Sequence, residues 1–457
     1  MFQPPLPQLP PEDDFLTDGV LRSSRFSDIY FSTENGLEEA RHVFIRGTGL
    51  QHRLSRESQL IIAETGFGTG LNFLAVIAEV LRQKSRTKID FISVEGCPPS
   101  KQNVATALQA FPELQKIFDE FLKKWPRRWL GVHHMSFLDG QISLHLHYGE
   151  AKEVLPTLDF SADIWFLDGF SPAKNPEIWS SEIIQHIARL SVHKARLATF
   201  TVAASVKTSL ADAGFICQRV AGFGRKRDML VASYMKGFSI GKQLPPRRVL
   251  VIGGGIAGCA VAGGLKTLGI KAIILDAAAQ EGAGASGNPA GIVVPFLTVG
   301  DTVGMRLSIS SLADTRAFLD AHDLIISNGV ISLDYDKRKS SRQKKIADQG
   351  FPSDLATYKG ADELSATCGL HVKSGGLLFE TGAVIQPRQL SGQLAEGVER
   401  IYGAQLRAIS GEEGAWIAHC MDGRTFLADH VVLCAGADFP ELLKTIGYDL
   451  GVYQVTS

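Results

Sequence analysis

Two glycine-rich loops, each preceded by an apolar run, constrain the fold of this chain more than any other feature of its sequence. The first loop, ETGFGTG, spans 64–70, and the second, GGGIAG, spans 253–258. An apolar strand that turns through glycines into a helix is the opening unit of a doubly wound sheet. Two such units in 457 residues predict two α/β domains in succession, because a single core rarely grows to that size.

The two halves are separated by GKQLPPRR, Gly241–Arg248, whose paired prolines interrupt both helix and strand. We therefore predict one domain over 1–240 and another over 248–457. In the first half, strand and helix patterns alternate, which predicts a mostly parallel sheet covered by helices on both faces. The last two strands are joined by only a short loop and are expected to pair antiparallel. Strands are expected at 60–64, 89–95, 144–148, 164–167, 197–202, 215–220 and 229–234, and helices at 71–81 and 100–110.

Composition limits the partners and cofactors of the chain. Lys and Arg number 47 against 48 Asp and Glu, so any contact with nucleic acid must be local. The cysteines form no Cys-x-x-Cys pair and no Cys/His cluster, which predicts no metal site and a reducing, cytoplasmic location. The start MFQPPLPQLPPEDD lacks the pattern of a signal peptide, and no run of about 18 apolar residues predicts a membrane span.

The first glycine-rich loop is a candidate cofactor site. Gly66, Gly68 and Gly70 alternate where a strand turns sharply into a helix, and their missing side chains let the backbone approach a ligand. This spacing differs from the G-x-G-x-x-G of a dinucleotide fold and suits a carboxylate and a ribose better than a pyrophosphate. Glu64 and Asn72 border the loop and are assigned to the same site. An ordinary tight turn is the alternative.

Three acids follow strands of the first half, at the edge where ligands of such sheets bind. Glu95 ends the strand FISVE, where a carboxylate can accept both hydroxyls of a ribose, and Glu150 follows LHLHY, where an acid could meet an adenine amino group. Asp168 closes ADIWFLDGF, where a carboxylate can hold an amine and accept its proton while Phe170 packs against the substrate. For each acid, a solvated loop carboxylate is the alternative.

Five longer motifs follow one another along the first half of the chain: DIYFSTENGLEEARHVFIRGTGL, ETGFGTGLNFL, WFLDGFSPAKNPEIW, LATFT and GFGRKRDML. In this order they resemble the MnmC family of bifunctional tRNA 5-methylaminomethyl-2-thiouridine biosynthesis proteins. The resemblance covers most of residues 15–235 and implies a Rossmann-like class I methyltransferase domain. It also implies S-adenosylmethionine as cofactor, tRNA as partner, and methyl transfer to the aminomethyl group of a wobble uridine with Asp168 at the reacting amine.

Basic residues near these motifs are candidates for contact with RNA. Lys174, Arg225, Lys226 and Arg227 could bind phosphates around the mouth of the methyl-transfer pocket. KKWPRRW, 123–129, interleaves cations with two tryptophans, either as a stacking surface for unpaired bases or as a solvated helix end with buried tryptophans. The alternating histidines near 145 have no suitably spaced acidic partner and are assigned no ligand role.

The second loop carries the fingerprint of a dinucleotide-binding fold. Gly253, Gly255 and Gly258 follow an apolar strand, and Asp276 ends the next strand about 20 residues further on, where an acid binds ribose. A pyrophosphate is expected at the start of the following helix. GAGASGNPAG, which contains Ser286, resembles the loop under the flavin in FAD-dependent oxidases of the D-amino-acid oxidase type. SGGLLFETGAVIQPRQL and ADHVVLCAGAD resemble later parts of that domain.

The family resemblance implies that this second domain binds FAD and removes a carboxymethyl group from the modified uridine, exposing the amine that the first domain methylates. Members of the family continue beyond the position of Ser457, so we expect an incomplete domain that binds FAD weakly and a colourless chain. The basic run KRKSSRQKK, 337–345, is expected to be a solvated loop, with an RNA-facing loop as the alternative. Two other functions stay open: a small-molecule amine methyltransferase fused to an amino-acid oxidase, and a non-catalytic scaffold.

Overall fold

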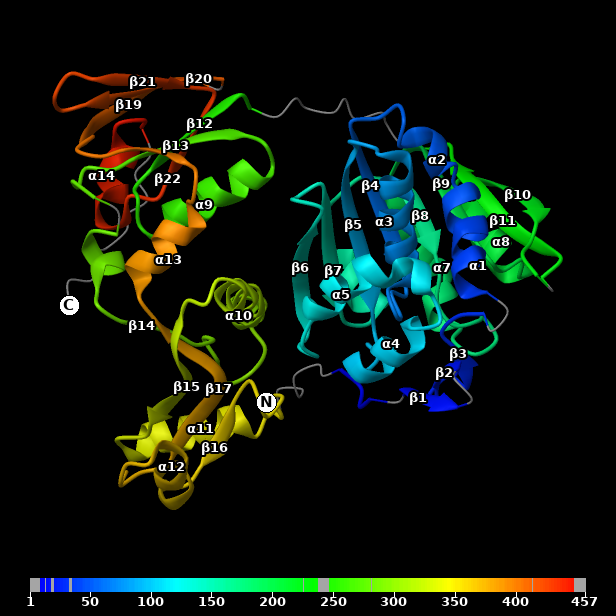
Figure 1. Cartoon of the computed structure of the whole chain (residues 1–457), viewed down its shortest axis with the longest axis horizontal. Coiled ribbons are helices and arrows are strands. Elements are labelled where there is room, and N and C mark those ends of the chain that lie inside the picture. The colour runs from blue at the N-terminus through cyan, green and yellow to red at the C-terminus, as the bar shows by residue number, and fades with distance from the viewer. Residues whose placement is uncertain are drawn as a thin grey trace. The chain divides into compact units, whose positions relative to one another are not determined.

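A computed structural model describes residues 9–12, 14–17, 20–32, 35–224, 226–236, 246–280, 282–412 and 414–447. The chain forms two compact units, one of residues 1–241 with 296–314 and the other of 242–295 with 315–457 (Figure 1). The predicted linker Gly241–Arg248 lies outside the described residues as far as 245. The mixed α/β class predicted for both halves is confirmed.

The first unit is built on an eight-stranded sheet of order β10-β11-β9-β8-β4-β5-β7-β6. The five central strands pair parallel, and β10 and β11 pair antiparallel at one edge, as predicted. The other edge strand, β6, was not predicted, and β9 begins earlier than expected. The strands are β4 (Gln59–Thr65), β5 (Lys88–Glu95), β6 (Gly131–Phe137), β7 (Ile142–Tyr148), β8 (Ala162–Leu167), β9 (Ser191–Thr199), β10 (Phe215–Ala221) and β11 (Asp228–Tyr234).

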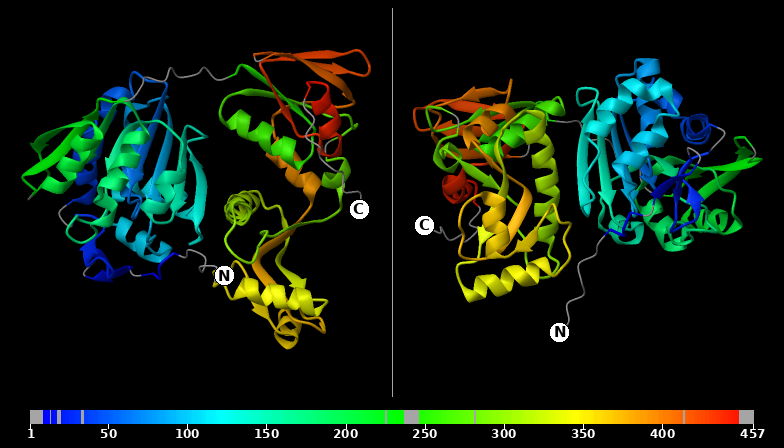
Figure 2. Two further views of the ribbon diagram at one scale, coloured as in Figure 1. Left: turned by 180° about the vertical axis from the view of Figure 1, so that it is seen from behind. Right: turned by 60° about the horizontal axis from the view of Figure 1, so that its bottom comes forward.

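Helices cover both faces of this sheet because its central strands are apolar on both sides. In β8 all six residues are buried, and successive side chains enter opposite cores. Ile164 and Phe166 join one hydrophobic cluster, whereas Trp165 and Leu167 join the other. Figure 2 shows the two helical layers. The helices are α1 (Gly36–Ala40), the π-helix η1 (Arg41–Arg46), α2 (Leu50–Arg53), α3 (Leu71–Gln83), α4 (Lys101–Leu108), α5 (Gln115–Lys123), α6 (Ala151–Val154), α7 (Ser181–Arg189) and α8 (Ala204–Ala213).

A small antiparallel sheet of β1 (Asp14–Thr17), β2 (Val20–Ser23) and β3 (Asp28–Ile29) precedes these elements. Its first residue is fixed to the start of α4, because the Asp14 carboxylate accepts hydrogen bonds from the Ser100 amide at 3.1 Å and from Asn103 Nδ2 at 2.8 Å. This attachment carries the segment after β2 toward the carboxyl ends of the central strands, where residues 25–32 line a cavity.

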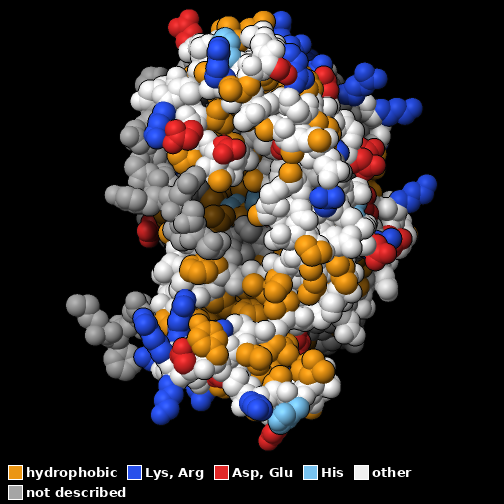
Figure 3. Space-filling model, turned by 90° about the vertical axis from the view of Figure 1, so that its left-hand side faces the viewer, with side chains coloured by type: hydrophobic (Ala, Val, Ile, Leu, Met, Phe, Trp, Pro, Cys, Tyr) orange, Lys and Arg blue, Asp and Glu red, His pale blue; other side chains and the backbone are white. Residues whose placement is uncertain are grey.

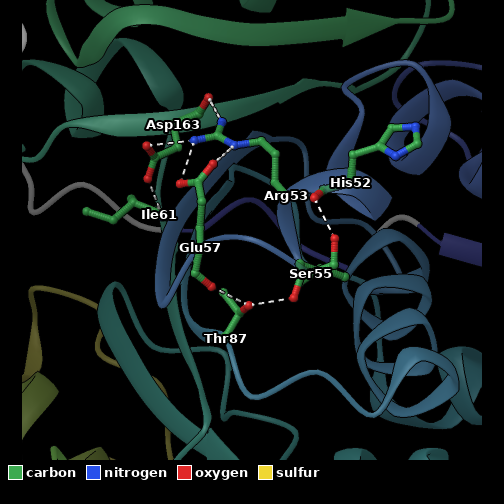
Figure 4. Close-up of polar contacts among 8 residues, drawn as sticks. His52, Arg53, Ser55, Glu57, Ile61, Thr87 and Asp163 are labelled. Carbon is green, nitrogen blue, oxygen red and sulfur yellow. Dashed lines mark hydrogen bonds and ion pairs between the residues drawn. The ribbon is translucent and has the colours of Figure 1, made fainter.

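A polar network joins the amino ends of β4 and β8 (Figure 4). Arg53, at the end of α2, donates to the Asp163 carbonyl at 2.9 Å and to its Oδ1 at 3.0 Å, and also pairs with Glu57. The other carboxylate oxygen of Asp163 accepts the Ile61 amide at 2.9 Å. Thr87 donates to the Glu57 carbonyl at 2.7 Å. The network ties α2, β4, β8 and the residue before β5 together at the end of the sheet opposite the cavity.

The second unit combines three sheets. A parallel sheet of order β18-β13-β12-β22 packs against α9 and α13, and two antiparallel sheets follow it. The strands are β12 (Arg248–Ile252), β13 (Lys271–Leu275), β14 (Gly291–Val293), β15 (Ile325–Leu333), β16 (Thr357–Lys359), β17 (Gly376–Ile385), β18 (Glu399–Ile401), β19 (Leu406–Glu412), β20 (Ala415–Cys420), β21 (Thr425–Ala428) and β22 (His430–Leu433). The helices are α9 (Ile256–Thr267), α10 (Val303–Ala321), α11 (Lys337–Ala347), α12 (Ala361–Cys368), α13 (Pro387–Leu394) and α14 (Phe439–Lys444).

The prediction of a loop at 337–345 is wrong, because this run forms most of helix α11. The Asp336 carboxylate caps the helix by accepting the Lys339 amide at 2.7 Å. Gln343 and Ile346 are buried and attach one side of the helix to the unit. In the part of the chain that is described, no helix is both long and apolar enough to span a bilayer.

Candidate functional site

The first unit contains a cavity of about 360 Å³ where β4, β5 and β8 end. Gly66, Glu95 and Asp168, which end or directly follow these strands, all line it, and residues 25–32 close it from the side of the small sheet. Carboxylates outnumber cations on its walls. The acids are Asp28, Glu39, Glu95, Glu150, Asp168 and Glu177, and the cations are Arg25, Lys152 and Lys226.

The glycine loop forms one wall and needs glycine for two different reasons. Gly66 has a φ of 78°, and a Cβ there would lie 2.9 Å from Gly169 Cα, so the loop packs directly against the backbone after β8. Gly68 has a φ of 54°, and a Cβ there would point at the Tyr30 ring, 3.3 Å away. A side chain at either position would therefore strain the backbone and crowd the cavity wall.

Glu95 holds this loop in place. Its Oε2 accepts the Gly68 amide at 2.7 Å, and its Oε1 accepts the Cys97 amide at 2.7 Å. Each carboxylate oxygen has a further lone pair, so the group can still accept ligand hydroxyls from the cavity. The glycines and an acid at the end of the second strand fit the ribose and carboxylate of S-adenosylmethionine, as the sequence analysis expected.

Asp168 belongs to a buried chain of hydrogen bonds that starts inside the sheet. Asn72 Nδ2, in the first turn of α3, donates to Asp168 Oδ2 at 2.7 Å and to Glu64 Oε1 at 2.8 Å. Ser93 Oγ donates to the other oxygen of Glu64 at 2.7 Å, and the Gly169 amide donates to Asp168 Oδ1 at 2.8 Å. Asn72 thus bridges two carboxylates, and Asp168 faces the cavity in a fixed orientation.

Burial changes the proton affinity of both acids. Loss of solvent contact raises the pKa of Asp168 to about 6, although the hydrogen bonds from Gly169 and Asn72 oppose the shift. Burial also raises the pKa of Glu64 well above its usual range, helped by the nearby charge of Asp168. A carboxylate with a pKa near 6 is largely ionised at neutral pH and is a suitable acceptor for a proton from an amine.

Aromatic rings form the opposite wall. Phe170 stacks on Phe26 with a centroid distance of 4.8 Å and meets Tyr30 edge-on at 5.1 Å. Lys226 Nζ lies 4.3 Å from the centroid of the Phe200 ring and pairs with Glu39 at 2.8 Å. The stacked rings of this wall could therefore bind a planar, apolar group, with a charged group beside it.

Other predicted residues lie at or beside the cavity. Glu150 lines it and pairs with Arg25 at 3.4 Å. Lys174 pairs with Asp28 at 3.1 Å, and Asp28 also accepts the Ser171 amide, so this lysine ties the loop after β8 to β3. Arg227 is exposed, and Arg225 lies outside the described residues.

The stacking surface proposed for KKWPRRW is wrong. Trp125 and Trp129 are only 8% and 1% exposed, so they are core residues after the end of α5 and cannot stack on bases. The four histidines near this region lie on β6 and β7, and burial lowers the pKa of His147 to about 4. Over the described part of the chain, no group of three or more His, Cys, Asp or Glu side chains is placed to hold a metal ion.

Sequence reasoning missed Phe26 and Asp28, which lie at the small sheet, and Glu39 of α1, all of which line the cavity. The signal that could have identified Asp28 is its place at the start of the first quoted motif. No periodic pattern in the sequence indicated that it lines the same cavity as Asp168.

The residues predicted to bind a dinucleotide lie together at the carboxyl end of β12. Gly255 is the N-cap of α9, and a Cβ on Gly258 would lie 1.9 Å from the Gly253 carbonyl oxygen, so only glycine fits between helix and strand. The Asp276 carboxylate accepts the Gly254 and Ala278 amides, and Ser286 Oγ accepts the Ile256 amide at 3.1 Å. These residues fit the pyrophosphate and ribose of FAD.

Two family models match the chain: S-adenosyl-L-methionine-dependent methyltransferase over residues 112–235, and FAD dependent oxidoreductase over 248–457. The chain is also similar to curated proteins described as tRNA 5-methylaminomethyl-2-thiouridine biosynthesis bifunctional protein MnmC. That of Marinobacter nauticus is 34% identical over 443 residues, 94% of this chain and 70% of that protein. That of Pseudomonas savastanoi pv. phaseolicola is 36% identical over 453 residues, 93% of this chain and 67% of that protein.

Proposed function

The chain belongs to the MnmC family of bifunctional proteins, and we propose that it modifies the wobble uridine of tRNA in two consecutive reactions. It is an enzyme with a methyltransferase domain that uses S-adenosylmethionine and an oxidoreductase domain that uses FAD. In the first reaction the carboxymethyl group is removed from 5-carboxymethylaminomethyl-(2-thio)uridine. In the second, the exposed 5-aminomethyl group is methylated. We propose that both reactions take place in the cytoplasm.

The observation that supports the methyl-transfer step is the position of Asp168 between the glycine loop and the aromatic wall. S-adenosylmethionine supplies the methyl group when it is bound by Gly66–Gly70 and Glu95. Asp168 holds the substrate amine and takes its proton, which keeps the nitrogen lone pair free. Asn72 keeps the carboxylate pointed at the cavity, and Phe170 and Phe26 are placed to pack against the uracil ring.

In the second unit, Gly253, Gly255 and Gly258 would lie against the pyrophosphate of FAD, and Asp276 would accept hydrogen bonds from its ribose. Ser286, which accepts the Ile256 amide at the start of α9, would help to hold the cofactor. FAD, when bound, supplies the oxidising power for removal of the carboxymethyl group. The expected weak binding of FAD stays a prediction, to be checked on the absorption spectrum of the purified chain.

Lys174, Lys226 and Arg227 are proposed contacts for RNA phosphates near the cavity, with Arg225 beside them in sequence. Changing Arg225, Lys226 and Arg227 together to Ala should weaken tRNA binding and reduce its dependence on salt, because phosphate contacts release counterions.

Transfer of labelled methyl groups tests the function. The chain should methylate tRNA that carries 5-aminomethyl-2-thiouridine, and should leave free primary amines and unmodified tRNA unlabelled. Methylation of the free amines at a comparable rate would instead establish the small-molecule methyltransferase.

A further inference from the structure

Helix α11 concentrates positive charge on one face of the second unit. Its eleven residues, Lys337–Ala347, have the sequence KRKSSRQKKIA and contain no acid. At 3.6 residues per turn, five of its six cations fall on one side of the helix, opposite the buried Gln343 and Ile346. These five residues, called here the α11 basic face, are Lys337, Arg338, Arg342, Lys344 and Lys345, and all are exposed.

Among the residues that the structure describes, none of the five cations of this face forms an ion pair. Lys344 has weaker partners, because its Nζ lies 5.2 Å from the centroid of the Tyr358 ring and its charge acts on Asp334. The whole chain carries a formal charge of −1, so the local excess is not part of a generally basic surface. The face of the second unit in Figure 3 shows Lys and Arg side chains gathered near its lower edge, beside hydrophobic side chains.

An exposed aromatic ring precedes helix α11 and lies beside Lys339, the one cation of the helix outside the basic face. Tyr335, just before the helix, is 81% exposed, and Lys339 Nζ lies 4.4 Å from the centroid of its ring. Gln343 Nε2 donates to the Ser332 carbonyl at 2.8 Å, so the helix is fixed to β15 and does not need a partner to keep its orientation. A rigid row of cations about 12 Å long, with an aromatic ring at one end, is the combination that binds phosphates and stacks an unpaired base.

We infer that the α11 basic face binds the sugar-phosphate backbone of tRNA, at a site separate from the cavity of the first unit. The inference rests on the proposed function, because that function makes a large polyanion the substrate of both units. The cations contact phosphates, which gives affinity without reading sequence. Tyr335 stacks on a base that is not paired.

An anionic membrane surface is the other large polyanion that such a face could meet, and the composition of the helix argues against it. An interfacial helix inserts an exposed apolar face below the lipid headgroups. In α11 the only large apolar side chain is Ile346, and it is buried in the unit. The exposed side is wholly polar.

The test uses the complete 457-residue chain and fluorescently labelled tRNA carrying 5-aminomethyl-2-thiouridine, with binding measured over a range of salt concentrations. One variant removes four charges of the basic face, and a matched variant removes four exposed charges spread over other elements. Thermal unfolding checks that both are folded. The first variant is Lys337→Gln, Arg338→Gln, Arg342→Gln and Lys345→Gln, and the second is Arg86→Gln, Lys101→Gln, Lys116→Gln and Lys207→Gln.

The α11 variant should bind about 10-fold or more weakly near 0.1 M salt, and the slope of log affinity against log salt should shrink by about 2 or more. The matched variant should keep the wild-type affinity, and both should keep the wild-type methylation rate at saturating tRNA. If the wild type methylates this tRNA and the α11 variant binds it as tightly, the inference is wrong and the proposed function stands. If the wild type neither binds nor methylates the tRNA, both fail. Loss of binding to phosphatidylserine vesicles, with tRNA binding unchanged, would overturn the inference in favour of a membrane.

Discussion

At the scale of single residues, Asp168 sets the expected pH dependence of methyl transfer. Burial raises the pKa of this carboxyl to about 6, so it is protonated below that pH and cannot accept a proton from the amine. The rate should therefore rise with pH, with a midpoint near 6, and level off above about 7. Single-turnover methylation of aminomethyl tRNA measures this profile.

Replacing the acid tests the same role. Asp168→Ala should lower methyl transfer about 10²-fold or more, because positioned acid-base groups contribute on that scale, and should leave S-adenosylmethionine affinity nearly unchanged. The exposed Asp159→Ala is the matched control. A variant at 168 with wild-type turnover, or one that keeps the pH midpoint, would remove Asp168 from the mechanism.

Asn72 is a positioning residue whose effect appears in the same profile. Its amide donates to Asp168 and lowers the pKa of that carboxyl, so Asn72→Ala should move the midpoint of the pH profile above 6. The maximal rate should fall about 10-fold, because Asp168 loses its fixed orientation. A slower enzyme with an unmoved midpoint would assign Asn72 a purely structural role.

Single residues at strand ends were predictable, whereas their partners were not. Asp168 and Glu95 stand directly after apolar strands, and parallel strands bring such positions to one edge. Asn72 was assigned to the cofactor loop because it adjoins Gly70, but its bridge between Glu64 and Asp168 depends on how α3 packs on the sheet. Phe26 and Asp28 reach the cavity through contacts between segments far apart in the sequence, namely Phe26 with Phe170 and Asp28 with Lys174, which no local pattern encodes.

At the scale of elements, the glycine loop should tolerate no side chain at Gly68. Gly68→Val should lower S-adenosylmethionine affinity at least 100-fold, because the new side chain would occupy the cavity wall beside Tyr30. Gly49→Val is the matched control, since Gly49 also has a positive φ but nothing lies within 4 Å of a Cβ there. Calorimetry measures the affinity of both variants for S-adenosylmethionine and so separates backbone strain, which both share, from occupation of the cavity wall, which only Gly68→Val causes. Equal affinities for the two variants would refute the loop assignment.

The Arg53 network should account for a measurable part of the stability of the first unit. Asp163 is 6% exposed, and Asp163→Ala would leave the Arg53 guanidinium without one buried partner and the Ile61 amide without its acceptor. The expected loss is about 3 kcal/mol of unfolding free energy. Urea unfolding measures this loss. The control is Asp159→Ala at an exposed position, for which the free energy of unfolding should change by no more than about 0.5 kcal/mol.

The elements were predictable where apolar runs were long. β4, β5 and β8 match their predicted ranges closely because both of their faces are buried. β9 starts six residues before the expected position at 197, because its first six residues, SVHKAR, are too polar to show an apolar pattern. β6, GVHHMSF, is an edge strand with an exposed face and was missed for the same reason. α11 was expected to be a loop because two buried residues leave little helical periodicity among its charges.

At the scale of the whole molecule, the cavity proposed for methyl transfer and the glycine loop proposed for FAD lie in different units, so we expect two separable activities. Asp276→Ala should weaken FAD binding about 10-fold or more, because this acid lies where the ribose is expected and also holds the loop of Gly254. Removal of the carboxymethyl group should fall, and methylation of tRNA that already carries the aminomethyl group should not. A parallel loss of both activities would show that the units do not act independently.

The two-unit organisation followed from the two glycine-rich loops, but the membership of each unit did not. Residues 296–314 group with the first unit although they follow the second loop in the sequence. Sequence position alone does not predict this grouping.

The acidic lining of the methyl-transfer cavity bears on how the spent cofactor leaves. S-adenosylmethionine carries a positive sulfonium, and the thioether that remains after transfer is neutral, so a lining in which six carboxylates face three cations attracts the first more than the second. The positive charge passes to the methylated amine on the RNA. Turnover thus abolishes the attraction that retained the donor, and product inhibition should be weak. Inhibition constants for S-adenosylhomocysteine should exceed the dissociation constant of the donor, most clearly at low ionic strength.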